Sequence, residues 1–383
     1  MQRRQLHVLI FPKWYPHSAD PQNGSFIAHY ARKLSLQHKV SVVFPVPVDE
    51  ETSPDVREDG NLLEIRIPYV QSLLLWTPIR KLINYTRFRN AVNQGVVQML
   101  AQREPPDLIH AQVLIRPALF ASRLSQHWEI PWLLTEHSSD FLRKHAMSKI
   151  KHRIIRQLCG QAAFLVTVSS PLAEKLQSIT GRTVEVIPNL ISFNTIKKTP
   201  APRDVIHIAV IADLVDTIKN ISGILNALAR IKEKIPPFKL TIVGDGRDGA
   251  FLKSLTADLE LREVVDFIGR KEQPEVMEFL AEIDFLITNS RIETFSIVSA
   301  EAIASGKPVI VTRCGGPDQW FRPGYGKMID ADDPAQLESA IVEMCTSFKS
   351  YNAAGMAREI REQFDPELVM TRYEDLYRQM TGL

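Results

Sequence analysis

Short apolar runs of strand length alternate with stretches of helical pattern along the whole chain of 383 residues. Apolar runs of four to eight residues bounded by turn residues are typical of strands that are buried on both faces. Such runs occur at His7–Phe11, Val40–Phe44, Leu108–His110, Trp132–Thr135, Phe164–Val168, Ile206–Ile211, Lys239–Val243, Val265–Phe267, Phe285–Thr288 and Pro308–Val311. Because helices of crossover length separate them, they predict an α/β chain with two doubly wound parallel sheets.

The length predicts two domains, because 383 residues exceed one ordinary hydrophobic core. Residues 1–190 and 205–365 are each expected to form a Rossmann-like domain, and the two domains are expected to face a cleft. The polar, proline-bearing stretch 191–204 is the predicted linker. An amphipathic helix is predicted within the last segment, 366–383.

The segment 284–312 holds two glutamates, Glu293 and Glu301, separated by seven residues. It predicts a strand, a loop, a short helix over 296–304 with Ser296 as its N-cap, and a second strand, which is a right-handed crossover in a parallel sheet. The N-terminus of such a helix points main-chain amides over the strand ends, which suits a phosphate. With a carboxylate on either side, the segment suits a sugar nucleotide, which is anionic in the middle and rich in hydroxyls at both ends.

These residues resemble the paired-glutamate signature of the retaining GT-B glycosyltransferases of group 1 type, a family that includes bacterial surface-polysaccharide and phosphoinositol mannosyltransferases. Further segments resemble that family in the same order: Phe11–Pro16, Gly24–Phe26, Asp107–His110, Thr135–His137, Val166–Ser169, Ile187–Asn189, Lys219–Asn220, Ile242–Gly246 and Val265–Gly269. The resemblance spans nearly the whole chain. It implies a GT-B fold with an N-terminal acceptor domain, a C-terminal nucleotide-sugar domain and a last helix that crosses back to the first domain.

The resemblance also implies roles for individual residues. Glu301 would hold the ribose hydroxyls, Glu293 would touch the transferred sugar, and Lys219 would neutralise the diphosphate as it leaves. His137 would lie against the donor sugar. Further donor contacts are implied for the main-chain amides of Thr294, Phe295 and Ser296, and for Gly24, Gly244 and Arg270.

Plainer interpretations of the same residues stay open. Glu301 could be a solvated helix residue, Lys219 a surface lysine and His137 a structural histidine. Gly24 could serve only as a turn glycine. The pair Gly244 and Gly246 marks a tight turn between a strand and a helix but lacks the full spacing of a phosphate loop.

One position departs from the family pattern. Six residues before Lys219, where the family usually has an arginine, this chain has Asp213. A carboxylate repels a diphosphate at a distance of a few ångströms. Either Asp213 points elsewhere, or another cation such as Arg247 or Arg270 compensates, or donor binding is weakened.

Charge is distributed unevenly along the chain. Residues 1–200 contain 25 Lys and Arg against 15 Asp and Glu, whereas the remainder contains 21 against 29. The basic stretches 141–158 and 73–89 mix cations with apolar residues, which suits an anionic membrane surface. The other interpretation of 141–158 is a core-facing stripe (Leu142, Met147, Ile150, Ile154 and Leu158) with a solvated basic back. No aromatic and basic interleaving accompanies the charge, so a nucleic-acid partner is not expected.

Other features point to the cytoplasm and to chemistry without a metal. The three cysteines lie far apart, which indicates a reducing compartment rather than a disulfide framework. No apolar run approaches the length of a membrane-spanning helix. The pair Asp330 and Asp332 superficially resembles a manganese motif, but turn and capping roles explain it better. A cytoplasmic protein, either soluble or peripheral on the inner face of the membrane, is therefore expected, with no metal or other cofactor.

The leading hypothesis is a retaining, metal-independent hexosyltransferase. It would use a nucleotide diphosphate sugar as donor and a hydroxyl of a glycan or lipid-linked acceptor in the synthesis of cell-surface polysaccharide. A sugar-nucleotide epimerase on the same fold is a second enzyme class, which the paired glutamates and Lys219 disfavour. A catalytically impaired GT-B scaffold or partner protein is the alternative of another kind, and its support is Asp213.

Overall fold

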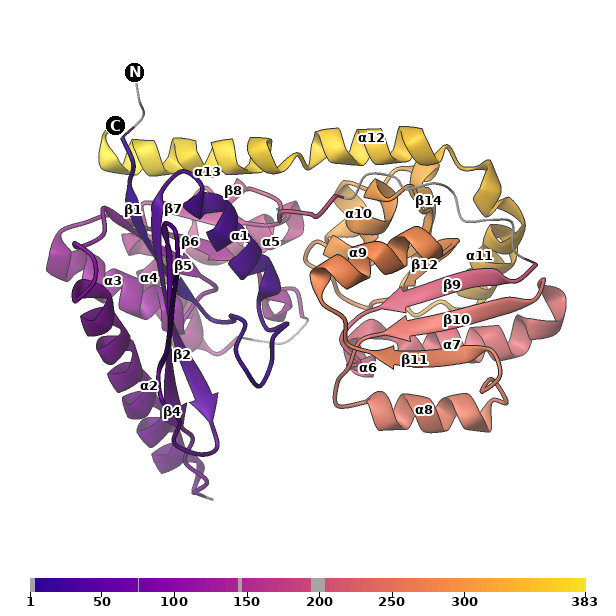
Figure 1. Cartoon of the computed structure of the whole chain (residues 1–383), viewed down its shortest axis with the longest axis horizontal. Coiled ribbons are helices and arrows are strands. Elements are labelled where there is room, and N and C mark those ends of the chain that lie inside the picture. The colour runs from indigo at the N-terminus through magenta and orange to yellow at the C-terminus, as the bar shows by residue number, and fades with distance from the viewer. Residues whose placement is uncertain (1–3, 75, 144–146, 194–203) are drawn as a thin grey trace.

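The computed structural model describes residues 4–74, 76–143, 147–193 and 204–383, which form two α/β domains side by side (Figure 1). Each domain is built on one sheet, and all strand pairs but one are parallel. The predicted fold class is therefore confirmed. The linker limits 191–204 stay a prediction, because residues 194–203 lie outside the described residues. Within the described ranges, no helix has the length and apolarity needed to span a membrane.

The first sheet has the order β3-β4-β2-β1-β5-β6-β7-β8. Its strands are β1 (His7–Pro12), β2 (Lys39–Val48), β3 (Asp55–Asp59), β4 (Leu62–Val70), β5 (Leu108–Gln112), β6 (Trp132–Glu136), β7 (Phe164–Thr167) and β8 (Glu185–Val186). Its helices are α1 (Ser25–Ser35), α2 (Thr77–Leu100), α3 (Arg116–Trp128), η1 (Ser139–Phe141), α4 (Lys149–Gln161) and α5 (Ser170–Thr180). The strand order reverses between β1 and β5, which opens a crevice at their carboxyl ends.

The second sheet has the order β11-β10-β9-β12-β13-β14, with its reversal between β9 and β12. Its strands are β9 (Ile206–Ile211), β10 (Phe238–Val243), β11 (Val265–Gly269), β12 (Phe285–Thr288), β13 (Val309–Arg313) and β14 (Gly326–Asp330). The helices that follow are α6 (Asp216–Lys219), α7 (Ile221–Ile231), α8 (Gly249–Asp258), α9 (Gln273–Glu282), α10 (Ile297–Ala304), α11 (Pro334–Ser347), α12 (Ala353–Gln363) and α13 (Pro366–Thr381). Short 3-10 turns lie at Lys232–Lys234, Pro317–Gln319, Pro323–Tyr325 and Phe348–Ser350.

The ten predicted strands all form, because continuous apolar runs can be buried by helices on both faces. The sequence pattern missed β3, β4, β8 and β14. In β4 the apolar run is interrupted by Glu64 and Arg66, which are both buried and form an ion pair at 3.2 Å. The hydroxyl of Tyr15 donates to the same glutamate at 2.6 Å. Because buried charges that pair with each other interrupt the apolar run, a prediction based on polarity misses this strand.

The predicted basic helix over 141–158 is shorter than expected, and its stripe is divided. Helix α4 begins at Lys149, after the N-cap Ser148, and residues 144–146 lie outside the described residues. Ile150 and Ile154 are 75% and 45% exposed, whereas Ile155, Leu158 and Cys159 are buried. The interpretation of these residues as a core-facing stripe is therefore wrong at Ile150 and Ile154, because α4 packs against the core through the face on which Ile155 lies.

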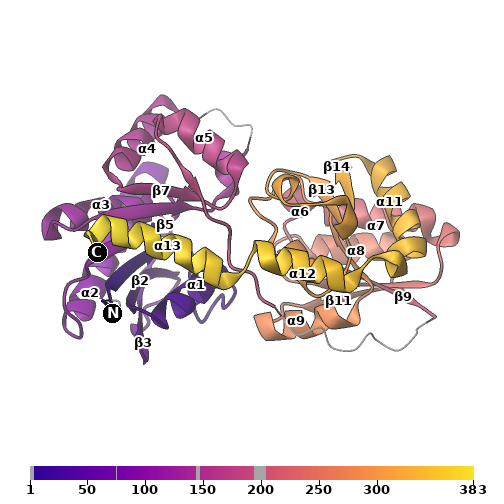
Figure 2. The ribbon, with the colours of Figure 1, turned by 90° about the horizontal axis from the view of Figure 1, so that it is seen from above.

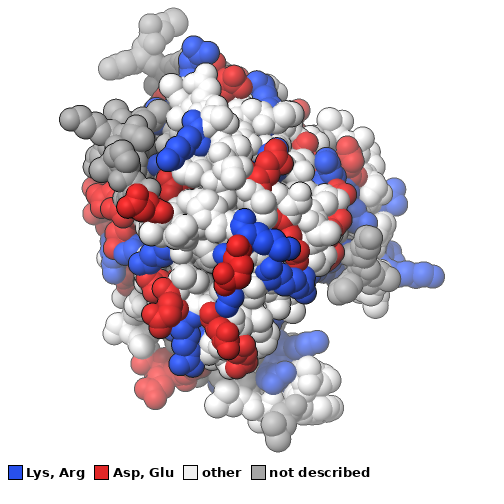
Figure 3. Space-filling view, turned by 90° about the vertical axis from the view of Figure 1, so that its right-hand side faces the viewer, with Lys and Arg blue, Asp and Glu red and all other residues white. Residues whose placement is uncertain are grey.

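The face of the second domain that Figure 3 shows is not of one charge sign, although this half of the chain is acidic. On the end face of the second domain, lysines and arginines are interspersed with aspartates and glutamates (Figure 3). In this domain, Lys327 pairs with Glu343 and Arg313 pairs with Asp330. The uneven charge of the two halves therefore does not by itself define a binding face there.

The chain returns to the first domain at its end. Helix α12 packs on α10 of the second domain, and α13 continues across the first domain (Figures 1 and 2). Val369, Met370, Tyr373, Leu376 and Tyr377 of α13 belong to a core cluster with residues of β1, α1 and β2. This apolar contact fixes the helix along one edge of the molecule.

Buried polar contacts add to the docking of α13. Glu374 accepts from His38 Nε2 at 2.5 Å and forms an ion pair with Arg378. The hydroxyl of Tyr377 hydrogen-bonds Tyr30 and, at 2.7 Å, His110 Nδ1. Burial lowers the pKa of His110 to about 3, so the ring stays neutral in this contact.

We expect Glu374→Ala to destabilise the protein by about 3 kcal/mol, because it leaves the buried His38 and the partly buried guanidinium of Arg378 without their partner. Glu367→Ala on the same helix is the control. It removes only a solvent-exposed pair with Lys33 and should cost about 1 kcal/mol or less. Urea unfolding followed by fluorescence measures both changes, and equal losses would contradict the buried polar docking.

Candidate functional site

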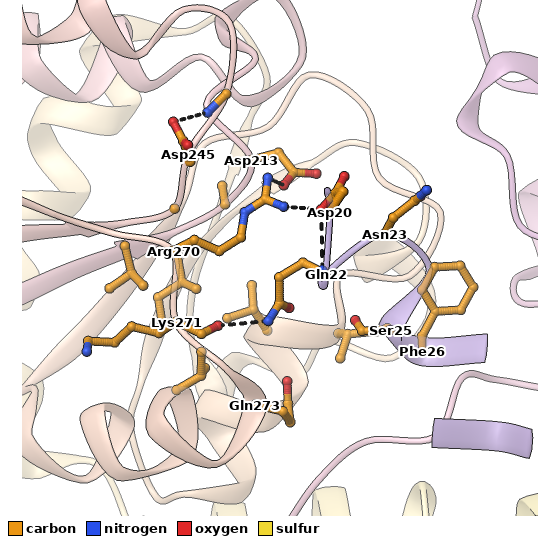
Figure 4. Close-up of a pocket in the computed structure, with 18 of the residues that line it drawn as sticks. Asp20, Gln22, Asn23, Ser25, Phe26, Asp213, Asp245, Arg270, Lys271 and Gln273 are labelled. Atoms are coloured by element: carbon orange, nitrogen blue, oxygen red, sulfur yellow. Dashed lines mark hydrogen bonds and ion pairs between the residues drawn. The ribbon is translucent and has the colours of Figure 1, made fainter. Parts of the chain in front are cut away.

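A cavity of about 580 Å³ lies between the two domains, and Figure 4 shows many of its lining residues. Its second-domain wall follows directly from the carboxyl ends of β9, β10 and β11, at Ala212, Gly244 and Arg270. The first domain contributes the loop after β1 and the start of α1, from Trp14 to Phe26. The site is therefore at the edge where parallel α/β sheets bind ligands.

Glu301 of α10 lines this cavity although its side chain is almost fully buried. Its Oε1 accepts from the main-chain N–H of Ser192 at 3.0 Å and from Gln273 Nε2 at 2.7 Å. Burial raises the pKa of Glu301 to about 7, and the hydrogen bonds oppose that rise. The predicted site residue thus lies at the cavity wall, next to the point where the chain leaves the first domain.

Glu293 and Lys219 are brought together, as an ion pair with Nζ and Oε1 2.6 Å apart. Ser290 Oγ donates to the same oxygen at 2.7 Å. Burial alone would lower the pKa of Lys219, but Glu293 outweighs it and keeps that pKa above its ordinary value. Lys219 ends the short helix α6, directly after the loop that contains Asp213. Neither member of the pair is among the residues that line the 580 Å³ cavity.

The turn before α10 is built differently from the expectation. Ser296 occupies the N-cap position, but its backbone is left-handed with φ 66°, and its Oγ hydrogen-bonds Ser299 Oγ at 2.8 Å instead of capping an amide. Phe295 is buried against Trp320 and Phe364, and Trp320 Nε1 donates to its carbonyl at 3.0 Å. Aromatic packing therefore holds the turn that carries the amides of Thr294, Phe295 and Ser296.

His137 follows β6 on the first domain and is held by its neighbours. Buried Glu136 accepts from its main-chain N–H at 2.9 Å and from that of Ser138 at 2.6 Å. The ring hydrogen-bonds Gln112 Oε1 through Nε2 at 2.7 Å and lies 4.8 Å from the ring of Phe26. Burial lowers the pKa of His137 to about 3, with a smaller opposing effect of the Asn189 side chain. His137 is therefore not among the residues that line the cavity, but it contacts Phe26, which is.

Gly24 and Gly244 line the cavity at positions where the fold leaves no room for a side chain. A Cβ on Gly24 would come 2.3 Å from the Trp14 carbonyl oxygen, and one on Gly244 would come 1.9 Å from that of Ala212. Both residues also have positive φ, 64° and 140°. Glycine is needed here because two main-chain segments approach each other closely.

Arg270 lies beside the unusual Asp213. Its Nη2 is 3.7 Å from Asp213 Oδ1, and its Nη1 forms an ion pair with Asp20 of the first domain. Sequence reasoning did not find Asp20 or the two glutamines Gln22 and Gln273. Gln22 Nε2 donates to the carbonyl of Lys271 at 3.1 Å and so also links the two domains. Polar loop residues carry no periodic signal, so nothing in the sequence marked them.

Candidate metal ligands are engaged elsewhere. Asp330 and Asp332 pair with Arg313 at 3.2 Å and with Arg291 at 2.6 Å. The following Asp333 caps α11 by accepting from the main-chain N–H of Gln336 at 2.9 Å. Among the residues that the structure describes, no three His, Cys, Asp or Glu side chains are grouped so that they could hold a metal ion.

The fold and the cavity at the strand ends define a two-domain enzyme of GT-B type. Residues 192–359 match the family profile described as glycosyl transferases group 1, and residues 24–189 match that of the glycosyl transferase 4-like domain. The two profiles cover most of the chain. The protein therefore belongs to the group 1 glycosyltransferases with a GT-B fold.

Individual relatives agree with this family. N-acetyl-alpha-D-glucosaminyl L-malate synthase of Bacillus anthracis is 26% identical over 297 residues, covering 73% of this chain and 76% of that protein. The putative teichuronic acid biosynthesis glycosyltransferase TuaC of Bacillus subtilis is 22% identical and covers 94% and 95%. Sucrose-phosphate synthase from Thermosynechococcus elongatus superposes with a TM-score of 0.81 at 19% identity, over 99% of this chain and 100% of that one. This structural match shows the fold.

The raised pKa of Glu301 predicts that the contribution of this residue to stability falls as pH rises. Its pKa of about 7 exceeds the ordinary unfolded value of about 4.3, so between these values the folded state binds more protons than the unfolded state. The contribution of Glu301 is complete below pH ~4 and lost above pH ~7, by about 3 kcal/mol. Glu301→Gln should therefore lose less thermal stability between pH 5 and 7.5 than the wild type. Glu263→Gln, at an exposed position, should behave as the wild type.

Proposed function

We propose that this protein is a retaining glycosyltransferase that moves a hexose-type sugar from a nucleotide diphosphate donor to a hydroxyl of a glycan or lipid-linked acceptor. The observation that carries the proposal is the carboxylate of Glu301 at the wall of a cavity formed by the carboxyl ends of β9, β10 and β11. The main-chain N–H of Ser192 and the Gln273 side chain both donate to Oε1 of Glu301, and the Ser192 side chain also hydrogen-bonds this carboxylate. We assign the remaining acceptor capacity of the carboxylate to the ribose hydroxyls.

The ion pair of Lys219 and Glu293 supports a site for the diphosphate and the transferred sugar. In the proposed reaction, the bond between the anomeric carbon and the donor phosphate oxygen breaks, and a bond to the acceptor hydroxyl oxygen forms on the same face. The acceptor proton passes to the departing phosphate. Lys219 stabilises the charge that develops on this leaving group, which is electrostatic catalysis. Glu293 orients Lys219 and contacts the sugar, and the main-chain amides of Thr294, Phe295 and Ser296 face the phosphates.

His137 is not a lining residue of the cavity, but its ring contacts that of Phe26, which is one. We propose that His137 completes the donor site when Phe26 changes position. The neutral imidazole then offers its ring edge to a sugar hydroxyl. We propose that no metal is required. The cations Lys219 and Arg270 would serve the phosphates instead.

A nucleotide panel tests the proposal. UDP, GDP, ADP and CDP, each with and without magnesium, are added to the wild type and to Glu301→Ala, and the midpoint of thermal unfolding is measured. At a hundred times its dissociation constant, a nucleotide stabilises by about 2.7 kcal/mol, which raises the midpoint by a few degrees. We expect one nucleotide to stabilise the wild type without magnesium and to have no effect on Glu301→Ala.

Glu301→Gln controls for the loss of side-chain volume and should also lose most of the stabilisation, since an amide has one acceptor oxygen. Stabilisation of Glu301→Ala equal to that of the wild type would contradict the ribose assignment. If none of the nucleotides stabilises the wild type, the result would favour the alternative, a GT-B scaffold that has lost donor binding.

The acceptor is proposed to be membrane-linked on the basis of the segment before and within α2. Leu73, Trp76 and Leu82 are 86%, 65% and 65% exposed, and Arg80, Lys81 and Arg87 accompany them. Exposed apolar side chains among cations suit the surface of an anionic bilayer. We propose a peripheral position on the inner face of the membrane for this reason.

Sedimentation with vesicles containing phosphatidylglycerol tests this position. The bound fraction of the wild type should fall as salt is raised, because attraction between basic side chains and anionic lipid is screened. Trp76→Ser should bind less than the wild type. Val97→Ser, at a 66% exposed position near the other end of α2, is the matched control and should bind equally. Binding that is absent or independent of salt would contradict the proposal.

A further inference from the structure

One arginine of the cavity is shared by carboxylates from both domains. Arg270, directly after β11, pairs through Nη1 with Asp20 and lies through Nη2 at 3.7 Å from Asp213 (Figure 4). Asp20 comes from the loop after β1 in the first domain, whereas Asp213 follows β9 in the second. The guanidinium therefore joins the two domains across the cavity.

We infer that Arg270 is the cation of the cavity wall that binds the donor diphosphate beside Lys219, and that Asp20 occupies Arg270 as an internal competitor while no nucleotide is bound. This inference rests on the proposed function and names the charge that compensates for Asp213. The carboxylate of Asp213 then helps donor binding, because it holds the guanidinium of Arg270, which comes from the end of β11 two strands away, at the edge of the cavity.

Among the residues that line the cavity, Arg270 is the cation best placed to bind the diphosphate. The cavity is lined by four carboxylates, those of Asp20, Asp213, Asp245 and Glu301, and by two cations, Arg270 and Lys271. The Lys271 ammonium pairs with Glu275 at 3.2 Å, and its side chain points away from Asp20 and Asp213 (Figure 4). A guanidinium also suits phosphate better, because its donors form a planar fork that can bind two oxygens at once.

The loop holds Asp20 in place against Arg270. Paired main-chain hydrogen bonds join His17 and Asp20 at 3.0 and 3.2 Å, and the Asp20 carboxylate accepts from the N–H of Gln22 at 3.3 Å. Gln22 in turn donates to the Lys271 carbonyl at 3.1 Å. The loop thus contacts the second domain through Asp20 and Gln22, with the carboxylate where an anionic ligand would bind.

A bound diphosphate would repel Asp20, because both are anions within a few ångströms of one guanidinium. Donor binding and the contact between the loop and the second domain are therefore mutually exclusive at Arg270. By linkage, whatever stabilises that contact weakens donor binding by the same factor. Asp20 consequently lowers donor affinity and releases its loop when the donor enters.

A double-mutant cycle tests the inference by calorimetry with the nucleoside diphosphate that stabilises the wild type. Asp20→Asn should bind it about threefold more tightly, since it removes the competitor. Arg270→Gln should bind about tenfold less tightly, through loss of a charged hydrogen bond. The double variant should bind like Arg270→Gln alone. Asp49→Asn removes an exposed charge of the same domain and should leave affinity unchanged.

Two results would overturn the inference. One is an Asp20→Asn affinity that is equal to or lower than that of the wild type. The other is an equal gain from Asp20→Asn with and without Arg270, which would reflect general charge removal and not competition for this guanidinium.

A second measurement separates this inference from the proposed function. The radius of gyration of the nucleotide-free protein, obtained by small-angle scattering at low salt, should be larger in Asp20→Asn than in the wild type and Asp49→Asn. If no nucleotide binds the wild type, the proposed function fails, and an enlarged Asp20→Asn still supports the contact between the domains. An equal radius in all three proteins would overturn that contact.

Discussion

The docking of α13 on the first domain is the interaction on which the arrangement of the two domains depends. The chain builds the first sheet, leaves for the second and then returns, so its last helix belongs to the core of the first domain. Apolar contacts of Tyr373 and Leu376 and the buried pairing of Glu374 with His38 hold it there. Because α12 packs on the second domain, the two helices span both domains and place the carboxyl ends of β9 to β11 opposite the loop after β1.

Charge inside the cavity decides how such a site can bind a donor. Carboxylates outnumber cations among its lining residues, and burial keeps Glu301 partly protonated near neutral pH. A dianionic diphosphate therefore depends on a few cations, of which Lys219 is already paired with Glu293 and Arg270 with Asp20. Each cation is positioned by an acid that is close to the place assigned to substrate. Binding then exchanges internal anions for those of the ligand, which makes affinity sensitive to the loop that carries Asp20.

Much of the fold could be predicted from the sequence because buried parallel strands have an unambiguous pattern. All ten apolar runs form strands, and the helix over 296–304 differs from α10 by one residue. The pattern failed where the core is polar, as in β4, whose Glu64 and Arg66 neutralise each other. It also failed for α4, where Ile150 and Ile154 are exposed although they continue an apolar spacing. The spacing of apolar residues identifies the apolar face of a helix, but it does not show whether that face packs against the core or faces solvent.

The sequence by itself determined the class of fold and predicted Glu293, Glu301 and Lys219 as site residues, since these follow from local pattern and motif order. The partners of these residues were decided only by tertiary structure. Glu301 meets Ser192 and Gln273, and the acid at 213 meets Arg270. Such contacts join residues that are 28 to 109 positions apart or that lie on different strand ends. They depend on strand order and domain closure, which no local stretch of sequence encodes.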